Sequence, residues 1–81
     1  MDARQHAQAA VEHIAEAVLM VLSEAARSGR PAISRAEISR RVGIPETNRG
    51  KQWITSWVLF WLEEQGKVRQ HKPRQGWSLA R

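Results

Sequence analysis

The side chains in this sequence that could take part in chemistry are mostly cations, and they are unevenly distributed along the chain. The 81 residues include 13 Lys and Arg against 8 Asp and Glu. Residues 1–26 hold one Arg against four carboxylates, a net charge of −3, whereas residues 27–81 hold twelve Lys and Arg against four Glu, a net charge of +8. The last fifteen residues contain five cations and no acid. Segregated positive charge of this kind is typical of a surface that binds a polyanion, although a basic protein that uses Arg for solubility would show it too.

Residue sets that would support catalysis or metal binding are not discernible. The sequence has no Cys, which removes disulfides, thiolate metal sites and Cys nucleophiles. His6 and His13 share one face of a predicted helix, but no acidic or sulfur ligand joins them. We interpret His71 as a solvated or phosphate-facing side chain, and Ser34 as a helix cap. With no Ser-His-Asp set, paired-carboxylate pocket or glycine-rich phosphate loop, we expect no enzymatic activity, no cofactor and no metal site.

The pattern of apolar residues predicts neither a membrane span nor an export signal. No apolar run approaches the roughly 18 residues that a span requires. The N-terminus, with Asp2 and Arg4, lacks the apolar stretch of a signal peptide. The chain has the length of a single domain, residues 1–81, and the absence of Cys suits the cytoplasm. We therefore expect one cytoplasmic domain that does not associate with a membrane.

A long helix over residues 2–27 is the first element that the sequence predicts. Asp2 and Gln5 have the spacing of a capping box, and residues 28–31, Ser-Gly-Arg-Pro, end the helix. One apolar stripe follows the helical period and contains Val11, Ile14, Ala15, Val18, Leu22 and Ala25. At about 1.5 Å per residue such a helix approaches 40 Å, more than a core of this size needs. Its first two turns are therefore expected to project as an arm or to pair with another subunit.

A second helix is predicted over residues 34–42. Ser34 and Glu37 have the spacing of a capping box, and Gly43 occupies the favoured position after the last turn. The buried side is expected to consist of Ala36, Ile38 and Val42, which leaves three cations pointing elsewhere: Arg35, Arg40 and Arg41.

The third helix, residues 49–65, has the strongest periodicity. Its apolar residues repeat in adjacent pairs every four positions, namely Trp53, Ile54, Trp57, Val58, Trp61 and Leu62, and they predict the face that packs on the core. By subtraction the opposite face is expected to carry Gln52, Thr55 and Ser56, followed by Leu59 and Glu63. The tryptophan series could alternatively stack on single-stranded bases or lie in a dimer interface.

A β-hairpin is predicted over residues 67–80. Residues 68–70 and 77–79 alternate apolar with polar side chains, as half-buried strands do. The basic connection between them, residues 71–76, contains turn-forming Pro and Gly. Ala32 and Ile33 are too few for a separate strand but could add one rung to this small sheet.

The order helix, short strand, helix, turn, helix and basic hairpin resembles the winged helix-turn-helix superfamily of bacterial and archaeal transcriptional regulators. The similar segments are residues 34–45, 63–68 and 76–79, and together the resemblance covers most of the chain. The sequence departs from a compact member between Pro45 and Gly66, where residues 46–51 look like a surplus. The resemblance implies a mainly helical fold with three helices, the first of them long, and a small β-hairpin wing.

The resemblance also implies a double-stranded DNA-binding regulator whose third helix enters the major groove. Gln52, Thr55 and Ser56 are the expected base or sugar-phosphate contacts. Phosphate contacts are expected from the second helix, from the start of the third and from the wing, that is from Arg35, Arg40, Arg41, Asn48, Arg49, Lys51, Arg69, Lys72 and Arg74. A homodimer through the N-terminal helix would read two half-sites and would be associated with the nucleoid. Two alternatives stay open: a protein-interaction module of a larger assembly, and a non-specific or single-stranded nucleic-acid binder.

Overall fold

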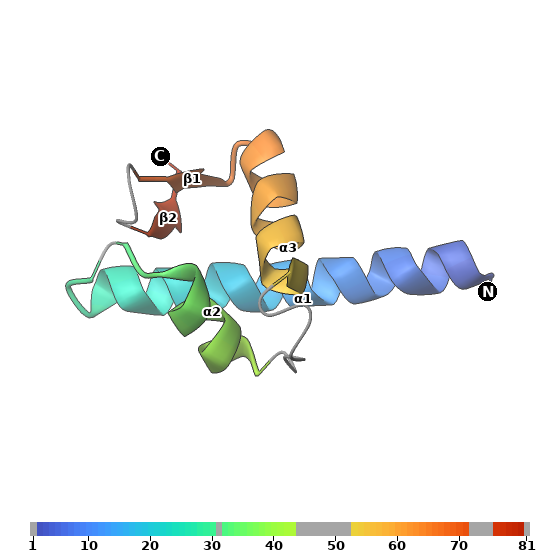
Figure 1. Ribbon diagram of the computed structural model, residues 1–81, viewed down its shortest axis with the longest axis horizontal. Coiled ribbons are helices and arrows are strands. Elements are labelled where there is room, and N and C mark those ends of the chain that lie inside the picture. The colour runs from blue at the N-terminus through green and yellow to red at the C-terminus, as the bar shows by residue number, and fades with distance from the viewer. Residues whose placement is uncertain (1, 31, 44–52, 72–75, 81) are drawn as a thin grey trace.

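The computed structural model describes residues 2–30, 32–43, 53–71 and 76–80. Helix α1 (Ala3–Arg27) is crossed by α2 (Arg35–Val42) and α3 (Trp53–Glu64), and a hairpin of β1 (Val68–Gln70) and β2 (Trp77–Leu79) follows (Figure 1). The prediction of a mainly helical chain with a long first helix and a small antiparallel hairpin is confirmed. Within the described residues, no helix is long and apolar enough to cross a membrane.

Helix α1 forms as its sequence predicts, and only its second half is buried. The side chain of Asp2 accepts a hydrogen bond from the backbone N–H of Gln5 at 2.9 Å, and Gln5 returns one to Asp2, which completes the capping box. The buried residues share one stripe and begin only at Ala15; they are Ala15, Val18, Val21, Leu22 and Ala25. The preceding turns therefore extend beyond the core, as the blue end of the ribbon does in Figure 1.

Helix α2 begins at the predicted place, but only half of the expected capping box forms. The Ser34 hydroxyl accepts a hydrogen bond from the backbone N–H of Glu37 at 3.1 Å. The Glu37 carboxylate does not return to the cap and binds the guanidinium groups of Arg30 and Arg41 instead, each with a shortest distance of 2.8 Å. An ion pair with two cations outcompetes one neutral N–H for the same oxygens. Gly43 ends the helix with φ of 83°, the left-handed conformation in which Gly carries little penalty.

The hairpin is joined to the rest of the chain through Ile33. In the antiparallel register Val68 faces Leu79 and Gln70 faces Trp77, and an isolated bridge pairs Ile33 with Trp77. The extra rung predicted for residues 32–33 is therefore confirmed. Gly76 lies against this rung with φ of 94°, where a side chain would overlap the Ile33 carbonyl group.

The core lies between the three helices and the hairpin, and it corrects the predicted face of α3. The buried α3 side chains include Val58, Leu59, Leu62 and Thr55, whereas Trp57 is 52% exposed. The buried arc is thus displaced by about one residue, roughly 100°, from the arc that the tryptophans predicted. The smaller side chains fill the space next to α1, whereas Trp61 packs at the margin of the core and Trp57 lies outside it.

Candidate nucleic-acid interface

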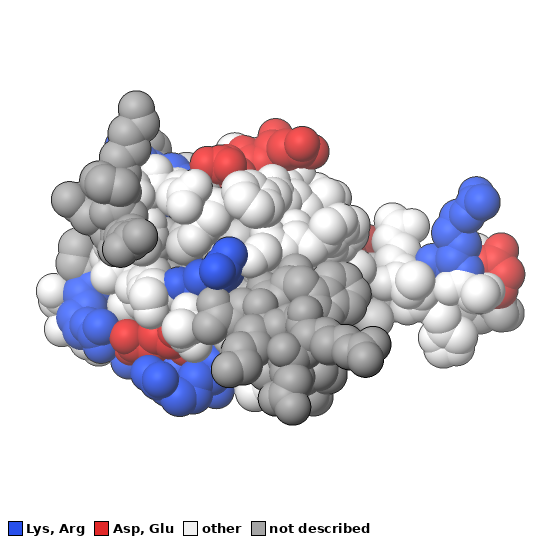
Figure 2. Space-filling view, in the orientation of Figure 1, with Lys and Arg blue, Asp and Glu red and all other residues white. Residues whose placement is uncertain are grey.

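Five of the described cations lie on α2 or at the adjoining end of α1, whereas Arg4 lies on the projecting arm of α1, and Lys67 and Arg69 lie at the hairpin. Arg35, Arg40 and Arg41 are all exposed on α2, and Figure 2 shows blue side chains over α2 and the adjoining end of α1, away from the projecting arm. Arg41 and Arg30 share the carboxylate of Glu37. The hydrogen-bonded Arg30 guanidinium holds the pKa of Glu37 below its usual value, and the charge of Arg41 adds to this effect. Glu37 therefore fixes two cations of this surface while remaining ionised.

Arg35 links α2 to α3. Its guanidinium donates a hydrogen bond of 2.7 Å to the Ser56 hydroxyl. These two residues are far apart in the sequence, and both are among the predicted contacts. The bond orients a cation across the outer side of α3, because a guanidinium that makes a directed hydrogen bond has few alternative positions. The structure thus brings a predicted phosphate contact and a predicted groove contact together.

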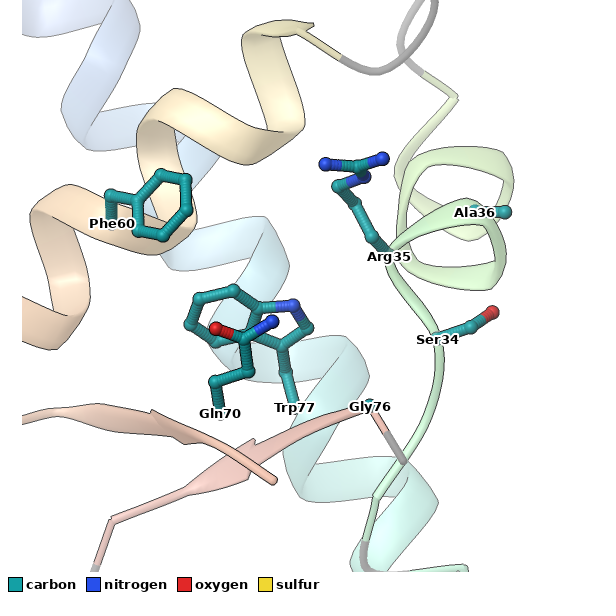
Figure 3. Close-up of a pocket in the computed structure, with 7 residues that line it drawn as sticks. All are labelled: Ser34, Arg35, Ala36, Phe60, Gln70, Gly76 and Trp77. Carbon is teal, nitrogen blue, oxygen red and sulfur yellow. The ribbon is translucent and has the colours of Figure 1, made fainter. Parts of the chain in front are cut away.

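A hollow of about 350 Å³ opens beside this pair, between α2, α3 and the hairpin (Figure 3). The ring of Phe60, which is 51% exposed, meets the ring of the buried Trp77 edge to face, with centroids 5.6 Å apart. The complete lining is Ser34, Arg35, Ala36, Phe60, Gln70, Gly76 and Trp77. A cation, an amide and two aromatic rings therefore face one concave surface.

Most of this lining was missed by reasoning from the sequence. Gln70 and Trp77 were treated only as strand residues, and Phe60 was given no role in the site. The available signal was the four-residue step from Ser56 to Phe60, which puts both on one ridge of a helix. Trp77 carried no such signal, because it comes close to the start of α2 only through the bridge to Ile33.

The structure contradicts the interpretations of Thr55 and His71. Thr55, expected to contact bases, is fully buried, and it faces the core because α3 is rotated relative to the predicted arc. His71, expected to be solvated or to face phosphate, is half-buried, and its Nε2 lies 2.7 Å from the Ser78 hydroxyl.

The remaining predicted contacts are only partly described. Arg69 is exposed on β1, opposite Ser78 in the register. Six predicted contacts lie outside the described residues: Asn48, Arg49, Lys51, Gln52, Lys72 and Arg74.

The outer side of α3 carries aromatic and acidic residues in place of further cations. Trp57 and Phe60 are each about half exposed, so the prediction that Trp57 belongs to the core is wrong. Glu63 and Glu64 are exposed at the end of the helix, where Figure 2 shows a red patch. Because these carboxylates repel phosphate, a nucleic acid would approach the first part of α3 more readily than its end.

A second concave surface lies between α3 and the projecting arm of α1. The indoles of Trp57 and Trp61 stack on each other with centroids 6.5 Å apart and planes 4° apart. They line a groove of about 310 Å³ together with Arg4, Ala7, Gln8 and Val11. We refer to this surface as the arm groove.

Comparison of the chain with protein-family models, with curated proteins and with solved structures finds no match. Within the part of the chain that the structure describes, no group of three or more His, Asp or Glu side chains is arranged to hold a metal ion.

Proposed function

We propose that this protein binds double-stranded DNA as a non-enzymatic regulator of the winged helix-turn-helix type. The observation that carries the proposal is the 2.7 Å hydrogen bond from Arg35 to Ser56, which aims a cation along the outer side of α3. It is supported by the segregated charge, since residues 27–81 carry a net charge of +8. A duplex offers the matching partner, a regular array of phosphates flanking readable base edges.

In the proposed complex the cations of α2 and Arg69 of the hairpin bind phosphates on either side of α3. Ser56 contacts a base edge or a sugar-phosphate group near the first part of α3. The carboxylates of Glu63 and Glu64 keep the end of this helix away from the backbone. Arg49, Lys51, Gln52, Lys72 and Arg74 belong to the proposed interface on the strength of the sequence alone.

The first experiment measures affinity for a random-sequence duplex of about three helical turns across a salt series by fluorescence anisotropy. Affinity should fall steeply with salt, because bound phosphates release counterions. Arg35→Gln and Arg69→Gln should each weaken binding and lower the salt slope by about one unit. Lys67→Gln, which removes an equal charge at an exposed position after the acidic end of α3, should leave both quantities unchanged. Absence of binding at low salt would overturn the proposal.

The proposal includes a homodimer that forms through the arm of α1. Arg4, Gln8 and Glu12 are spaced four residues apart on one ridge of the helix. An antiparallel pair of arms with a two-fold axis at Gln8 places Arg4 of each arm opposite Glu12 of the other arm. The same pairing lets each arm cover the arm groove of the other copy, where Trp57 is half exposed. A parallel pair would instead bring like charges together.

Sedimentation over a concentration series, combined with a charge swap, tests this dimer. Arg4→Glu should weaken association, and the double variant Arg4→Glu with Glu12→Arg should restore it, because the opposite charges are only exchanged. Trp57→Gln should weaken association, whereas Phe60→Gln, a change at an equally exposed aromatic residue outside the arm groove, should not. A monomer at every concentration, or a charge swap that fails to rescue, would overturn the dimer.

A protein-interaction module is the second candidate, and the exposed aromatic face of α3 favours it. Trp57 and Phe60 are 52% and 51% exposed beside Glu63 and Glu64, a combination more typical of a protein interface than of a surface that faces phosphate. The double variant Glu63→Lys with Glu64→Lys separates the candidates. It should strengthen duplex binding if α3 lies within about 10 Å of phosphates, the Debye length at moderate salt, because a repulsion is then replaced by an attraction. An interaction module would show no such gain.

A further inference from the structure

The indole N–H of Trp77 is a hydrogen-bond donor at the wall of the hollow. Trp77 is only 4% exposed, and it lines the hollow. Figure 3 shows this nitrogen on the edge of the ring that faces α2, toward the hollow. An indole N–H can only donate, so the hollow presents a donor suited to an acceptor from outside the chain.

Arg35 and Gln70 add further polar groups to the same hollow. Arg35 is exposed, and the Ser56 hydroxyl fixes its guanidinium at 2.7 Å, so positive charge is held at the rim. Gln70, opposite Trp77 in the strand register, contributes an amide that can both donate and accept. A cation next to an N–H donor favours an anionic oxygen ligand, because both groups donate to it.

Phe60 gives the hollow an apolar side that a simple anion would leave uncovered. Its ring is 51% exposed and is braced by its edge-to-face contact with Trp77. An exposed ring held by a neighbour is a suitable stacking platform for a planar group. The hollow measures about 350 Å³, near the lower end of the range for small-molecule sites, which is room for one nucleotide unit.

We propose that this hollow binds a single unpaired nucleotide, with its phosphate at Arg35 and the Trp77 N–H and its base on Phe60. The proposal rests on the DNA-binding function proposed above, and it assigns one nucleotide of the bound DNA to this hollow. Within a duplex only a base that leaves the stack can reach such a site. The protein should therefore prefer DNA that contains an extrahelical nucleotide.

The test compares a perfect duplex with the same duplex carrying a one-nucleotide bulge, using anisotropy at fixed salt. The bulged duplex should bind about tenfold more tightly, which corresponds to about 1.4 kcal/mol and lies within the range for one stacked base. Phe60→Leu should abolish this preference and leave affinity for the perfect duplex unchanged. Trp77→Phe, which removes the N–H donor together with the five-membered ring and keeps a six-membered aromatic ring, should reduce the preference. Trp57→Leu, a matched change at the other half-exposed aromatic residue, should preserve it.

Calorimetric titration with dAMP, deoxyadenosine and inorganic phosphate supplies the second measurement. dAMP should bind more tightly than either of its parts, and Phe60→Leu should remove the advantage over phosphate. Equal affinity for both duplexes would overturn the nucleotide site while leaving the duplex proposal intact. Phosphate that binds as tightly as dAMP would have the same consequence. Binding of dAMP without binding of either duplex would instead support the hollow and overturn the proposed DNA function.

Discussion

Thr55 provides a direct test of the way in which α3 faces the core. Its side chain is fully buried, and its hydroxyl oxygen has no hydrogen-bond partner in the described part of the chain. A buried polar group left without a partner costs about 1–3 kcal/mol of desolvation. Thr55→Val replaces this hydroxyl with a methyl group of nearly the same shape, so the cost is removed and no cavity is created.

The expected gain in the free energy of unfolding comes from the desolvation cost of the buried hydroxyl. Thr and Val are both β-branched and have similar helix propensities, so the helix itself should be little affected. Taking the lower end of the desolvation cost, we expect Thr55→Val to raise the free energy of unfolding by about 1 kcal/mol. For a domain of this size, that corresponds to an increase in Tm of about 4–8 °C. Thr55→Ser, which keeps the hydroxyl and removes a buried methyl group, should lower stability by a similar amount.

Thermal unfolding followed by circular dichroism, at one protein concentration for all variants, measures these shifts. Duplex affinity of the same samples supplies the second readout, and it should be unchanged in Thr55→Val because the side chain does not reach the surface. A fall in Tm of Thr55→Val would show that the hydroxyl makes a stabilising bond. A loss of duplex affinity without a loss of stability would show that Thr55 faces the ligand, and the facing of α3 described above would then be wrong.

Three further predictions concern the core, the hairpin and the ion pairs. Leu59→Ala should cost about 2–5 kcal/mol in urea unfolding, as expected for a fully buried leucine, whereas Glu63→Ala should change stability by less than about 0.5 kcal/mol; similar small effects would contradict the buried arc. Gly76→Ala should lower Tm more than Gly29→Ala, since both have positive φ but only a side chain at position 76 meets the Ile33 carbonyl; equal effects would refute this close contact. The pKa of Glu37 is lowered in the folded chain, mainly by Arg30, so the stabilisation from this carboxylate is complete above the unfolded Glu pKa of about 4.3 and is lost as pH falls through the folded pKa. Glu37→Gln should therefore be less stable than the wild type at neutral pH and should lose less stability on acidification. Parallel profiles of stability against pH for the two proteins would contradict this.

Local signals in the sequence determined the elements and most of their ends. Asp2 with Gln5, Ser34 and Gly43 act on backbone groups within a few residues, so their effect depends little on the rest of the fold. The alternation in residues 68–70 and 77–79 likewise marked both strands. The hydrogen-bond partner of the Glu37 carboxylate was not determined by its sequence neighbours, because Arg30 comes from the loop that follows α1.

Only the tertiary structure decided which side of α3 faces the core and which residues form the hollow. Apolar residues surround most of α3, so periodicity could not distinguish an arc centred on the tryptophans from one that includes Thr55 and Leu59. The core space next to α1 determines which arc is buried, because Val58, Leu59 and Leu62 fill it and Trp57 stays outside. In the same way, Arg35, Phe60 and Trp77 come from three separate elements, and they meet because the bridge to Ile33 holds the hairpin near the start of α2. The sequence thus determined charge, caps and periodicity, which act locally, whereas side-chain volume in a shared core decided which residues form the surface available to a ligand.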